Sequence, residues 1–392
     1  MPERKSGWNN LKGFDLKLFL LFFLLIYGGF HLLFFLRIQA AIRMGGMGFA
    51  ILLLLLAAGF LAPLIIRALE GRVSDLLVRF LALLGYYWMA FLLFFLFVSL
   101  FVELYNFVAL AVVSRFNGNI DAFIPTAGMR FMIPAAVAVL LAVYGSFEAG
   151  SLRTEFLTIH SEKIPKEIGK IRIVQISDVH IGGALQAGNV SGIIRAVREA
   201  APDVVVSTGD LVDGRGTYLE EAARQFSEIK PKWGKFAVAG NHEFYLGIDK
   251  ATEFMEEAGF VFLRNRTATI AGAVDLIGVD DPGGVMEAKV IVDDRELLSR
   301  TEGNHFKILL KHRPDVEKKA IGFFELQLSG HTHSGQIFPF SIVTNLVFPY
   351  HAGDYQLSQE SLLHVNRGAG VWGPPIRLLA PPEIMVIDLL SK

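Results

Sequence analysis

The sequence lacks cysteine, and it has no excess of either charge. None of the 392 residues is Cys, which excludes a disulfide-stapled scaffold, a cysteine-ligated zinc finger and a thiol nucleophile. The formal net charge is −1, which argues against a polybasic nucleic-acid binder, and no nucleic-acid partner is expected. Charged residues make up only 19% of the chain and hydrophobic residues 53%, so intrinsic disorder is excluded as well.

Charge is also absent from four long apolar runs within the first 150 residues. These runs hold 19, 23, 23 and 17 residues without Asp, Glu, Lys or Arg. About 20 helical residues cross a hydrocarbon core of roughly 30 Å, and buried helices of soluble proteins are rarely so apolar on all sides. We therefore predict a four-helix transmembrane anchor over residues 1–150. Its spans are expected near 18–36, 44–66, 80–102 and 131–147.

The predicted anchor carries little that would serve transport. Its spans contain no ionisable residue except His31, which we interpret as a packing or interfacial residue rather than a proton relay. The first run is longer than the apolar region of a cleaved signal peptide, and more spans follow it, so we expect it to be retained. The apolar stretch Leu104–Val113 is too short to span alone. It either extends the third helix or lies at the membrane interface.

Basic residues are distributed unevenly between the two sides of the predicted anchor. With four crossings, the N-terminus, the loop between the second and third spans and the C-terminal part share one side. Because cytoplasmic loops carry an excess of Lys and Arg, we predict a multi-pass cell membrane protein with a cytoplasmic C-terminal domain. That side carries Arg4, Lys5, Lys12, Lys17, Arg67, Arg72, Arg79, Arg153, Lys163 and Lys166, and the other carries Arg37, Arg43, Arg115 and Arg130.

After residue 170, short apolar runs alternate with amphipathic stretches. Alternation of this kind predicts an α/β domain with a buried sheet over 171–392, and we interpret 151–170 as the linker that precedes it. The expected strands are 171–177, 203–208, 235–239, 260–263, 274–279, 305–310, 325–328, 361–365 and 384–389, and the expected helices are 190–200, 218–229 and 249–258.

Polar motifs follow five of these expected strands. Open α/β sheets bind their ligands outside the carboxyl ends of the strands, so we expect the motifs to converge. Any one of them alone would more often be an ordinary turn or loop, but five in this order favour a metal site. The motifs are Asp178-Val179-His180, Gly209-Asp210-Leu211-Val212-Asp213, Gly240-Asn241-His242-Glu243, Lys311-His312 and Gly330-His331-Thr332-His333.

The residue types in these motifs suit metal ions. Carboxylate, imidazole and amide groups bind divalent ions such as Mn, Fe, Zn, Co or Ni. Residues two apart in an extended chain point to the same side, so Asp178 and His180 are expected to face one ion. The same argument places His331 and His333 on one ion. A carboxylate can bridge two ions, and Asp210 is the candidate for that role.

The series of motifs resembles that of the calcineurin-like metallophosphoesterases over about residues 171–390. The sequence around Gly330–Gln336, Asn366–Gly370 and Arg377–Ile384 is similar to the membrane-associated bacterial branch. That branch includes phosphodiesterases related to UDP-2,3-diacylglucosamine diphosphatase. Ser334 departs from the glycine usual there, but it only flanks the site. The resemblance implies a four-layer α/β/β/α fold, with two facing mixed sheets flanked by helices, and a binuclear metal centre.

The resemblance also implies a role for each motif residue. His242 would contact the phosphate and protonate or stabilise the leaving oxygen, while Asp213 would tie down its own loop and Glu243 would orient His242 or close the turn. Arg367 and Arg377 are either phosphate contacts or structural residues. Asp178, His180 and His333 would hold the first metal, Asn241, His312 and His331 the second, and Asp210 would bridge them.

The implied activity is hydrolysis of phosphoester or diphosphate bonds by a metal-activated hydroxide that attacks phosphorus. The anchor favours a lipid-linked or nucleotide-linked substrate, because a site beside a bilayer meets such molecules at high local concentration. The apolar segment 337–350 is either an acyl-chain groove or interface contact, or packing within the domain. The alternatives for function are a phosphatase of soluble phosphoesters or phosphoproteins and a non-catalytic membrane sensor of metal or phosphate.

Overall fold

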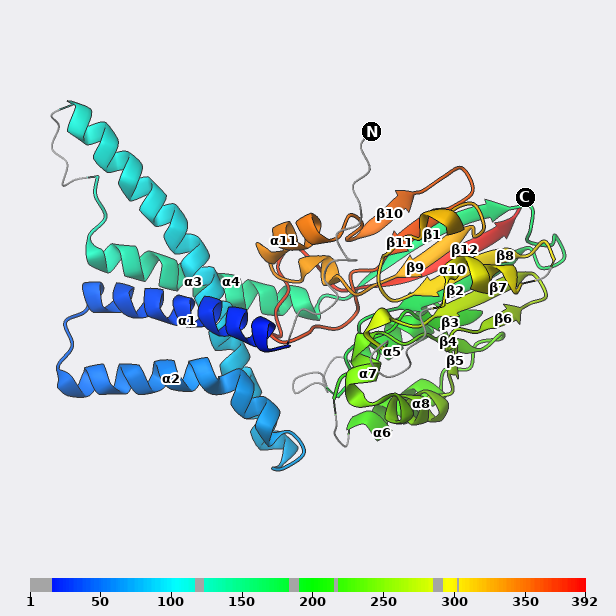
Figure 1. Cartoon of the computed structure of the whole chain (residues 1–392), viewed down its shortest axis with the longest axis horizontal. Coiled ribbons are helices and arrows are strands. Elements are labelled where there is room, and N and C mark those ends of the chain that lie inside the picture. Colours follow the sequence, from blue (N-terminus) through cyan, green and yellow to red (C-terminus); the bar gives the residue numbers. More distant parts are fainter. Residues whose placement is uncertain (1–15, 117–122, 183–189, 215–217, 285–291, 302) are drawn as a thin grey trace. The chain divides into compact units, whose positions relative to one another are not determined.

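The chain forms two compact units in the computed structural model, which describes residues 16–116, 123–182, 190–214, 218–284, 292–301 and 303–392. The first unit comprises the chain up to Arg67 together with Leu84–Ala142, and it is helical (Figure 1). The second unit comprises Ala68–Leu83 together with Val143–Lys392, and it contains the sheets (Figure 1). Arg4, Lys5 and Lys12, used above to predict orientation, lie outside the described residues.

Four helices among the described residues are long and apolar enough to cross a membrane. The predicted spans are therefore confirmed as helices, and each helix is longer than its charge-free run. The apolar stretch Leu104–Val113 continues the third helix without a break, which was one of the two alternatives. The helices are α1 (Leu16–Ala41), α2 (Gly46–Leu69), α3 (Asp75–Phe116) and α4 (Ala127–Gly150).

His31 is a packing residue of the helical unit. Its side chain is buried between aromatic rings, with Nδ1 2.8 Å from the carbonyl oxygen of Tyr27. The indole Nε1–H of Trp88 donates to His31 Nε2 at 2.9 Å. A neutral ring with its hydrogen on Nδ1 satisfies both bonds at once. Because both ring nitrogens are engaged in hydrogen bonds, the structure favours a packing role for His31 over a proton relay.

The first sheet of the second unit has six strands in the order β1-β12-β2-β3-β4-β5. Strands β2 to β5 run parallel, β12 is antiparallel to β2, and β1 is parallel to β12. The strands are β1 (Arg153–Ser161), β2 (Lys170–Ile176), β3 (Val204–Ser207), β4 (Lys235–Ala237), β5 (Val261–Phe262) and β12 (Glu383–Ser391).

The segment expected to be a linker, 151–170, instead contains β1. This strand pairs with β12 along its whole length, from Arg153 opposite Glu383 to Ser161 opposite Ser391. Only one face of β1 meets the core, through Leu157 and Ile159, while the other face is exposed. Such an edge strand carries half the apolar signal of the buried strands, and it is recognisable only from its partner at the far end of the chain.

The second sheet also has six strands, in the order β10-β11-β9-β8-β7-β6. Its four central strands are parallel, and β10 and β6 are antiparallel at the two edges. The edge strands β6 and β10 were not among the predicted strands, because each is short and mostly exposed. The strands are β6 (Thr267–Ile270), β7 (Val274–Val279), β8 (Phe306–Lys311), β9 (Leu326–Ser329), β10 (Gly353–Gln356) and β11 (Leu362–Val365).

The two sheets face each other across one apolar core, and helices cover their outer faces (Figure 1). Ile173 and Val206 of the first sheet pack in the same core as Ile308 and Leu328 of the second. A second core joins the outer face of the first sheet to α5 (Val190–Glu199), α6 (Tyr218–Ser227) and α8 (Ile248–Glu257). A third joins the second sheet to α10 (Asp294–Ser299). This arrangement confirms the predicted four layers.

The remaining elements are short and lie in the loops between strands. Helix α7 begins within the third polar motif, and a 3-10 turn, η6, begins at His333, the final residue of the last motif. Their bounds are α7 (Asn241–Leu246), η4 (Pro282–Gly284), η5 (Lys318–Ala320), η6 (His333–Gly335) and α11 (Phe340–Val347).

Candidate metal centre

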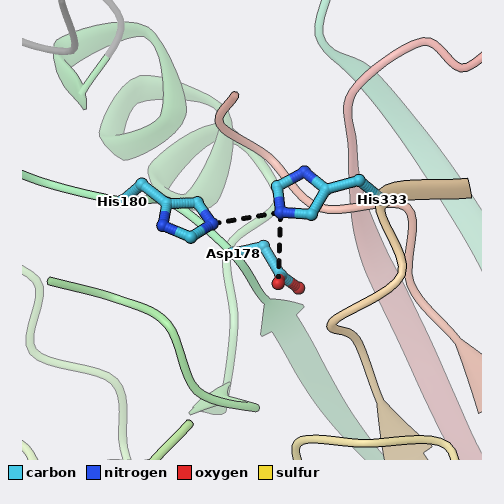
Figure 2. A group of neighbouring side chains, drawn as sticks. All are labelled: Asp178, His180 and His333. Atoms are coloured by element: carbon cyan, nitrogen blue, oxygen red, sulfur yellow. Dashed lines mark hydrogen bonds and ion pairs between the residues drawn. The ribbon is translucent and has the colours of Figure 1, made fainter. Parts of the chain in front are cut away.

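Three side chains meet where β2 and β9 end. Asp178 and His180 follow β2, and His333 follows β9, and all three are buried. Figure 2 shows the two imidazole rings facing each other, with Nε2 of His180 3.0 Å from Nε2 of His333. Nε2 of His333 also lies 3.4 Å from Oδ1 of Asp178 (Figure 2). A carboxylate and two imidazoles converging on one point form a donor set suited to a divalent ion.

A second donor set lies where β3, β8 and β9 end. His312 Nε2 is 3.1 Å from Oδ2 of Asp210 and 3.1 Å from Nδ1 of His331. The other ring nitrogen of His312, Nδ1, lies 2.9 Å from the carbonyl oxygen of Thr208. That contact fixes the hydrogen on Nδ1 and leaves the Nε2 lone pair for a ligand, as is usual for metal-binding histidines.

Asp210 also belongs to a third donor set, with His180 and His242. Its Oδ2 lies 3.9 Å from Nε2 of His242 and 3.1 Å from Nε2 of His312. Asp210 is therefore the residue shared by the second and third sets, while His180 links the third set to the first. Burial lowers the pKa of His331 and of His333, which favours the neutral form that a metal ligand needs.

Asn241 supplies a separate indication that the site binds an ion. The residue is buried at the start of α7, and its Oδ1 has no hydrogen-bond partner among the described residues. A buried amide oxygen without a partner is costly, and coordination of a cation would satisfy it. The donors around Asp210 together with this oxygen thus fit a metal.

The pairing of ligands differs from the one expected for extended chain. His331 and His333 are two residues apart, but they belong to different donor sets. Asp178, His180, His331 and His333 have φ angles of 52°, 55°, 72° and 49°. In this left-handed region the alternation of a strand no longer holds, so the geometric argument for His331 and His333 was wrong. Unfavourable backbone of this kind is concentrated at functional sites.

Close backbone approach also shapes the site. A Cβ atom on Gly240 would lie 2.2 Å from Oδ1 of Asp210, and one on Gly330 would lie 2.2 Å from Oδ2 of Asp178. These separations are far below van der Waals contact, so the two positions require glycine. These two glycines of the polar motifs therefore allow the close approach of the site loops.

Glu243 holds two of the site loops together. Its carboxylate accepts backbone N–H bonds from Gly240 at 2.7 Å, Asp210 at 3.0 Å, Leu211 at 2.8 Å and Val212 at 3.1 Å. The residue is fully buried. It closes the turn before α7 and fixes the Asp210 loop against it, rather than orienting His242.

Asp213 contacts two site histidines, which sequence reasoning missed. Its carboxylate pairs with Nδ1 of His242, and its Oδ2 lies 3.3 Å from Nδ1 of His180. Burial opposes protonation of His242, but the hydrogen bond with Asp213 and the charge of Asp210 prevail and raise the pKa of His242 to about 9. The spacing Asp210-x-x-Asp213 was the only feature of the sequence that indicated a second carboxylate near the site. It did not reveal that the second carboxylate points back into the site.

Arg367 and Arg377 are structural residues. Arg377 is fully buried, and its guanidinium donates to the carbonyl oxygens of Gly370 and Ala380 at 3.0 and 2.8 Å. Arg367 pairs with Glu155 and with Glu383. Because carbonyl and carboxylate groups engage both guanidinium groups, the structure favours the structural alternative over a phosphate contact.

Comparison with known proteins identifies the family of the α/β domain. The calcineurin-like phosphoesterase family matches residues 171–335. A metallophosphoesterase of Aquifex aeolicus is 37% identical over 65% of this chain and 98% of its own length. One of Bacillus subtilis is 34% identical over 67% of this chain and 96% of its own. A zebrafish transmembrane protein with a metallophosphoesterase domain is 30% identical over 71% of this chain and 67% of its own.

The family match, the metallophosphoesterase relatives and the apolar helices together define a metal-dependent phosphoester hydrolase that carries four candidate membrane-spanning helices. The chain belongs to the calcineurin-like metallophosphoesterases, and its relatives include bacterial proteins and a vertebrate one.

Proposed function

We propose that this protein is a membrane-anchored two-metal hydrolase of phosphodiester or diphosphate bonds. The observation that carries the proposal is the sharing of donors between sets, with Asp210 common to the second and third and His180 common to the first and third. A single ion would need only one set. Linked sets that share a carboxylate support two ions placed side by side.

The ligands in this proposal come from five strand ends. When bound, the two ions would supply positive charge to the phosphoryl oxygens and lower the pKa of a water molecule. Several divalent ions suit these ligands, namely Mn, Fe, Zn, Co and Ni. Asp178, His180 and His333 would hold one ion, Asn241, His312 and His331 the other, and Asp210 would bridge them.

His242 would act as the proton donor to the leaving oxygen. Its Nδ1 is held by Asp213, so Nε2 points toward Asp210 and the centre of the site. The hydrogen bond with Asp213 and the charge of Asp210 raise the pKa of His242, which favours the protonated form that a general acid needs. Asp213 would act through His242 and is therefore a positioning residue.

A phosphodiester suits the charge of the site better than a phosphomonoester does. A monoester carries about two negative charges near pH 7, and a diester carries one. Arg367 and Arg377 were the candidates for neutralising the second negative charge of a monoester. Both are already bound by carboxylate or carbonyl groups of the protein. This supports the diester class, and the apolar helices support a substrate that is linked to a lipid or reaches the membrane as a nucleotide conjugate.

A turnover screen tests the proposal. Purified full-length protein would be stripped of metal, reloaded with Mn²⁺, and assayed with bis-p-nitrophenyl phosphate, p-nitrophenyl phosphate and a lipid diphosphate. We expect metal-dependent hydrolysis with the diester or diphosphate preferred over the monoester, and about two ions per chain by elemental analysis. Preference for the monoester would favour the phosphatase alternative. Two bound ions without any turnover would favour the sensor.

A further inference from the structure

Helix α11, Phe340–Val347, exposes an apolar surface that no part of the described chain covers. None of its residues is buried, and the segment 337–350 contains no Asp, Glu, Lys or Arg. Leu346 is 82% exposed. A contiguous exposed apolar surface of this kind marks an interaction site. Its exposed large side chains are Phe340, Ile342, Val343, Leu346 and Val347.

Helix α11 begins beside the end of the membrane helix α4. The backbone N–H of Phe338 donates to the carbonyl oxygen of Leu378 at 3.1 Å. The preceding residue, Ile337, forms an isolated parallel β-bridge with Leu378. In the same loop, the N–H of Arg377 donates to the carbonyl oxygen of Gly145 at 3.0 Å. Gly145 belongs to the last turns of α4, which are part of the same compact unit.

Glu148 strengthens this connection between α4 and the loop. Its carboxylate accepts the N–H groups of Leu379 at 3.2 Å and Ala380 at 3.0 Å, and the side chain is buried. A Cβ atom on Gly145 would lie 2.4 Å from a methyl carbon of Ile376, so helix and loop are in direct contact there. The start of α11 is thereby joined, through the loop that holds Arg377 and Leu378, to the last turns of α4.

The depth of this junction follows from the length of α4. A helix of 24 residues is about 36 Å long, slightly more than the hydrocarbon core of roughly 30 Å. Gly145 lies five residues from its end, within the last two turns, and its neighbours Tyr144 and Phe147 are exposed apolar residues. In a membrane-spanning α4, the loop that contacts Gly145 therefore lies near the boundary between the hydrocarbon and the headgroups. The segment just before α11 is hydrogen-bonded to that loop.

Helix α11 also adjoins the metal centre. It follows η6, which contains His333, and the ring of Phe348 after its end lies 5.5 Å from the ring of His331. Trp372 is 56% exposed, and its ring lies 6.1 Å from that of His242. Apolar side chains thus continue from α11 to the edge of the site.

We propose that α11 lies in the interfacial layer of the bilayer that α4 crosses and holds the metal centre close to the membrane surface. The exposed Phe, Ile, Val and Leu side chains of this uncharged helix gain free energy when they leave water for a neighbouring apolar layer. The occupant is the lipid surface rather than another protein, because the junction with α4 places that surface next to α11 in every molecule. The contact does not depend on the proposed reaction.

Depth-dependent quenching tests this placement, and the absence of native cysteine makes the labelling unambiguous. Leu346→Cys would be labelled with a polarity-sensitive dye in full-length protein reconstituted into phosphatidylcholine–phosphatidylglycerol vesicles. Glu257→Cys, at an exposed position of α8, is the matched control. We expect at least twofold stronger quenching by 5-doxyl lipid at Leu346→Cys than at the control, with a blue-shifted emission. Equal quenching at both positions would overturn the proposal.

Two further measurements separate the other possible occupants. If the dye is shielded from aqueous iodide but not quenched by doxyl lipid, a protein surface covers α11 and the proposal is wrong. Adding Leu346→Asp to a labelled Val343→Cys protein should reduce lipid quenching to the control level, because a buried charge disfavours insertion. Hydrolysis of bis-p-nitrophenyl phosphate is measured in parallel. If the wild type hydrolyses neither this diester nor a lipid diphosphate, the proposed function is refuted and the quenching result stays valid.

Discussion

At the scale of single residues, Asp210 is the side chain on which the proposed chemistry depends most. It belongs to two donor sets and also accepts the backbone N–H of His242 at 2.9 Å. We predict that Asp210→Asn lowers kcat by at least about 10³-fold, because a neutral amide cannot bridge two cations, while the fold persists. His242→Ala should have a comparable effect on kcat with metal still bound.

The matched control for these variants is Asp249→Asn, at the start of α8 away from the site. Circular dichroism and elemental analysis would establish folding and metal content, and steady-state kinetics the rate. Full turnover by either site variant would refute the assigned roles.

Asp213 offers a test based on pH. The pKa of His242 is raised to about 9 by Asp213 and Asp210, against the effect of burial. A general acid works in its protonated form, so activity is lost as the pH rises through its pKa. Asp213→Asn removes a charge and a hydrogen-bond acceptor, which lowers the pKa of His242. The alkaline limb of the kcat profile should therefore move to lower pH.

The comparison needs equal metal content, because Asp213 also contacts His180. Bound cations would lower the His242 pKa in both proteins, but they do not change the direction of the difference between them. An alkaline limb that stays in place, with metal content unchanged, would exclude His242 as the proton donor.

At the scale of elements, the site is built from loops that are tied to one another rather than from rigid strands. Glu243 accepts four backbone N–H groups from two loops. We predict that Glu243→Ala lowers the free energy of unfolding by at least about 3 kcal/mol, since several buried donors would lose their acceptor. Glu253→Ala, exposed on α8, should change stability by less than about 0.5 kcal/mol. Urea unfolding followed by tryptophan fluorescence measures both.

The elements themselves were recognisable to different degrees. Strands β2, β3, β7 and β8 are buried on both faces and appear in the sequence as compact apolar runs, so they were predicted within one or two residues. The edge strand β1 was interpreted as a linker, because its partner β12 lies at the other end of the chain. Pairing over such a separation leaves no local signal.

At the scale of the whole molecule, the side of the membrane is open to direct test. The positive-inside rule places the α/β domain in the cytoplasm. We predict that protease added to sealed right-side-out vesicles leaves this domain intact and that detergent makes it accessible. A soluble protein enclosed in the same vesicles, which protease should reach only after detergent, controls for vesicle integrity. Cleavage of the domain before detergent would show the opposite orientation.

The sequence by itself determined the charge-free spans, the buried strands and the chemistry of the ligands. Those features are local, because a run of apolar residues or a polar motif after a strand needs no distant partner. Only the tertiary structure decided which histidines face one another, since the ligands have left-handed backbone that breaks the alternation of a strand. It also decided that Asp213 turns back to His242 and that no described residue covers α11, whose preceding segment is hydrogen-bonded to the loop at the end of α4. Each of these depends on contacts between segments far apart in the chain, which periodicity and composition do not encode.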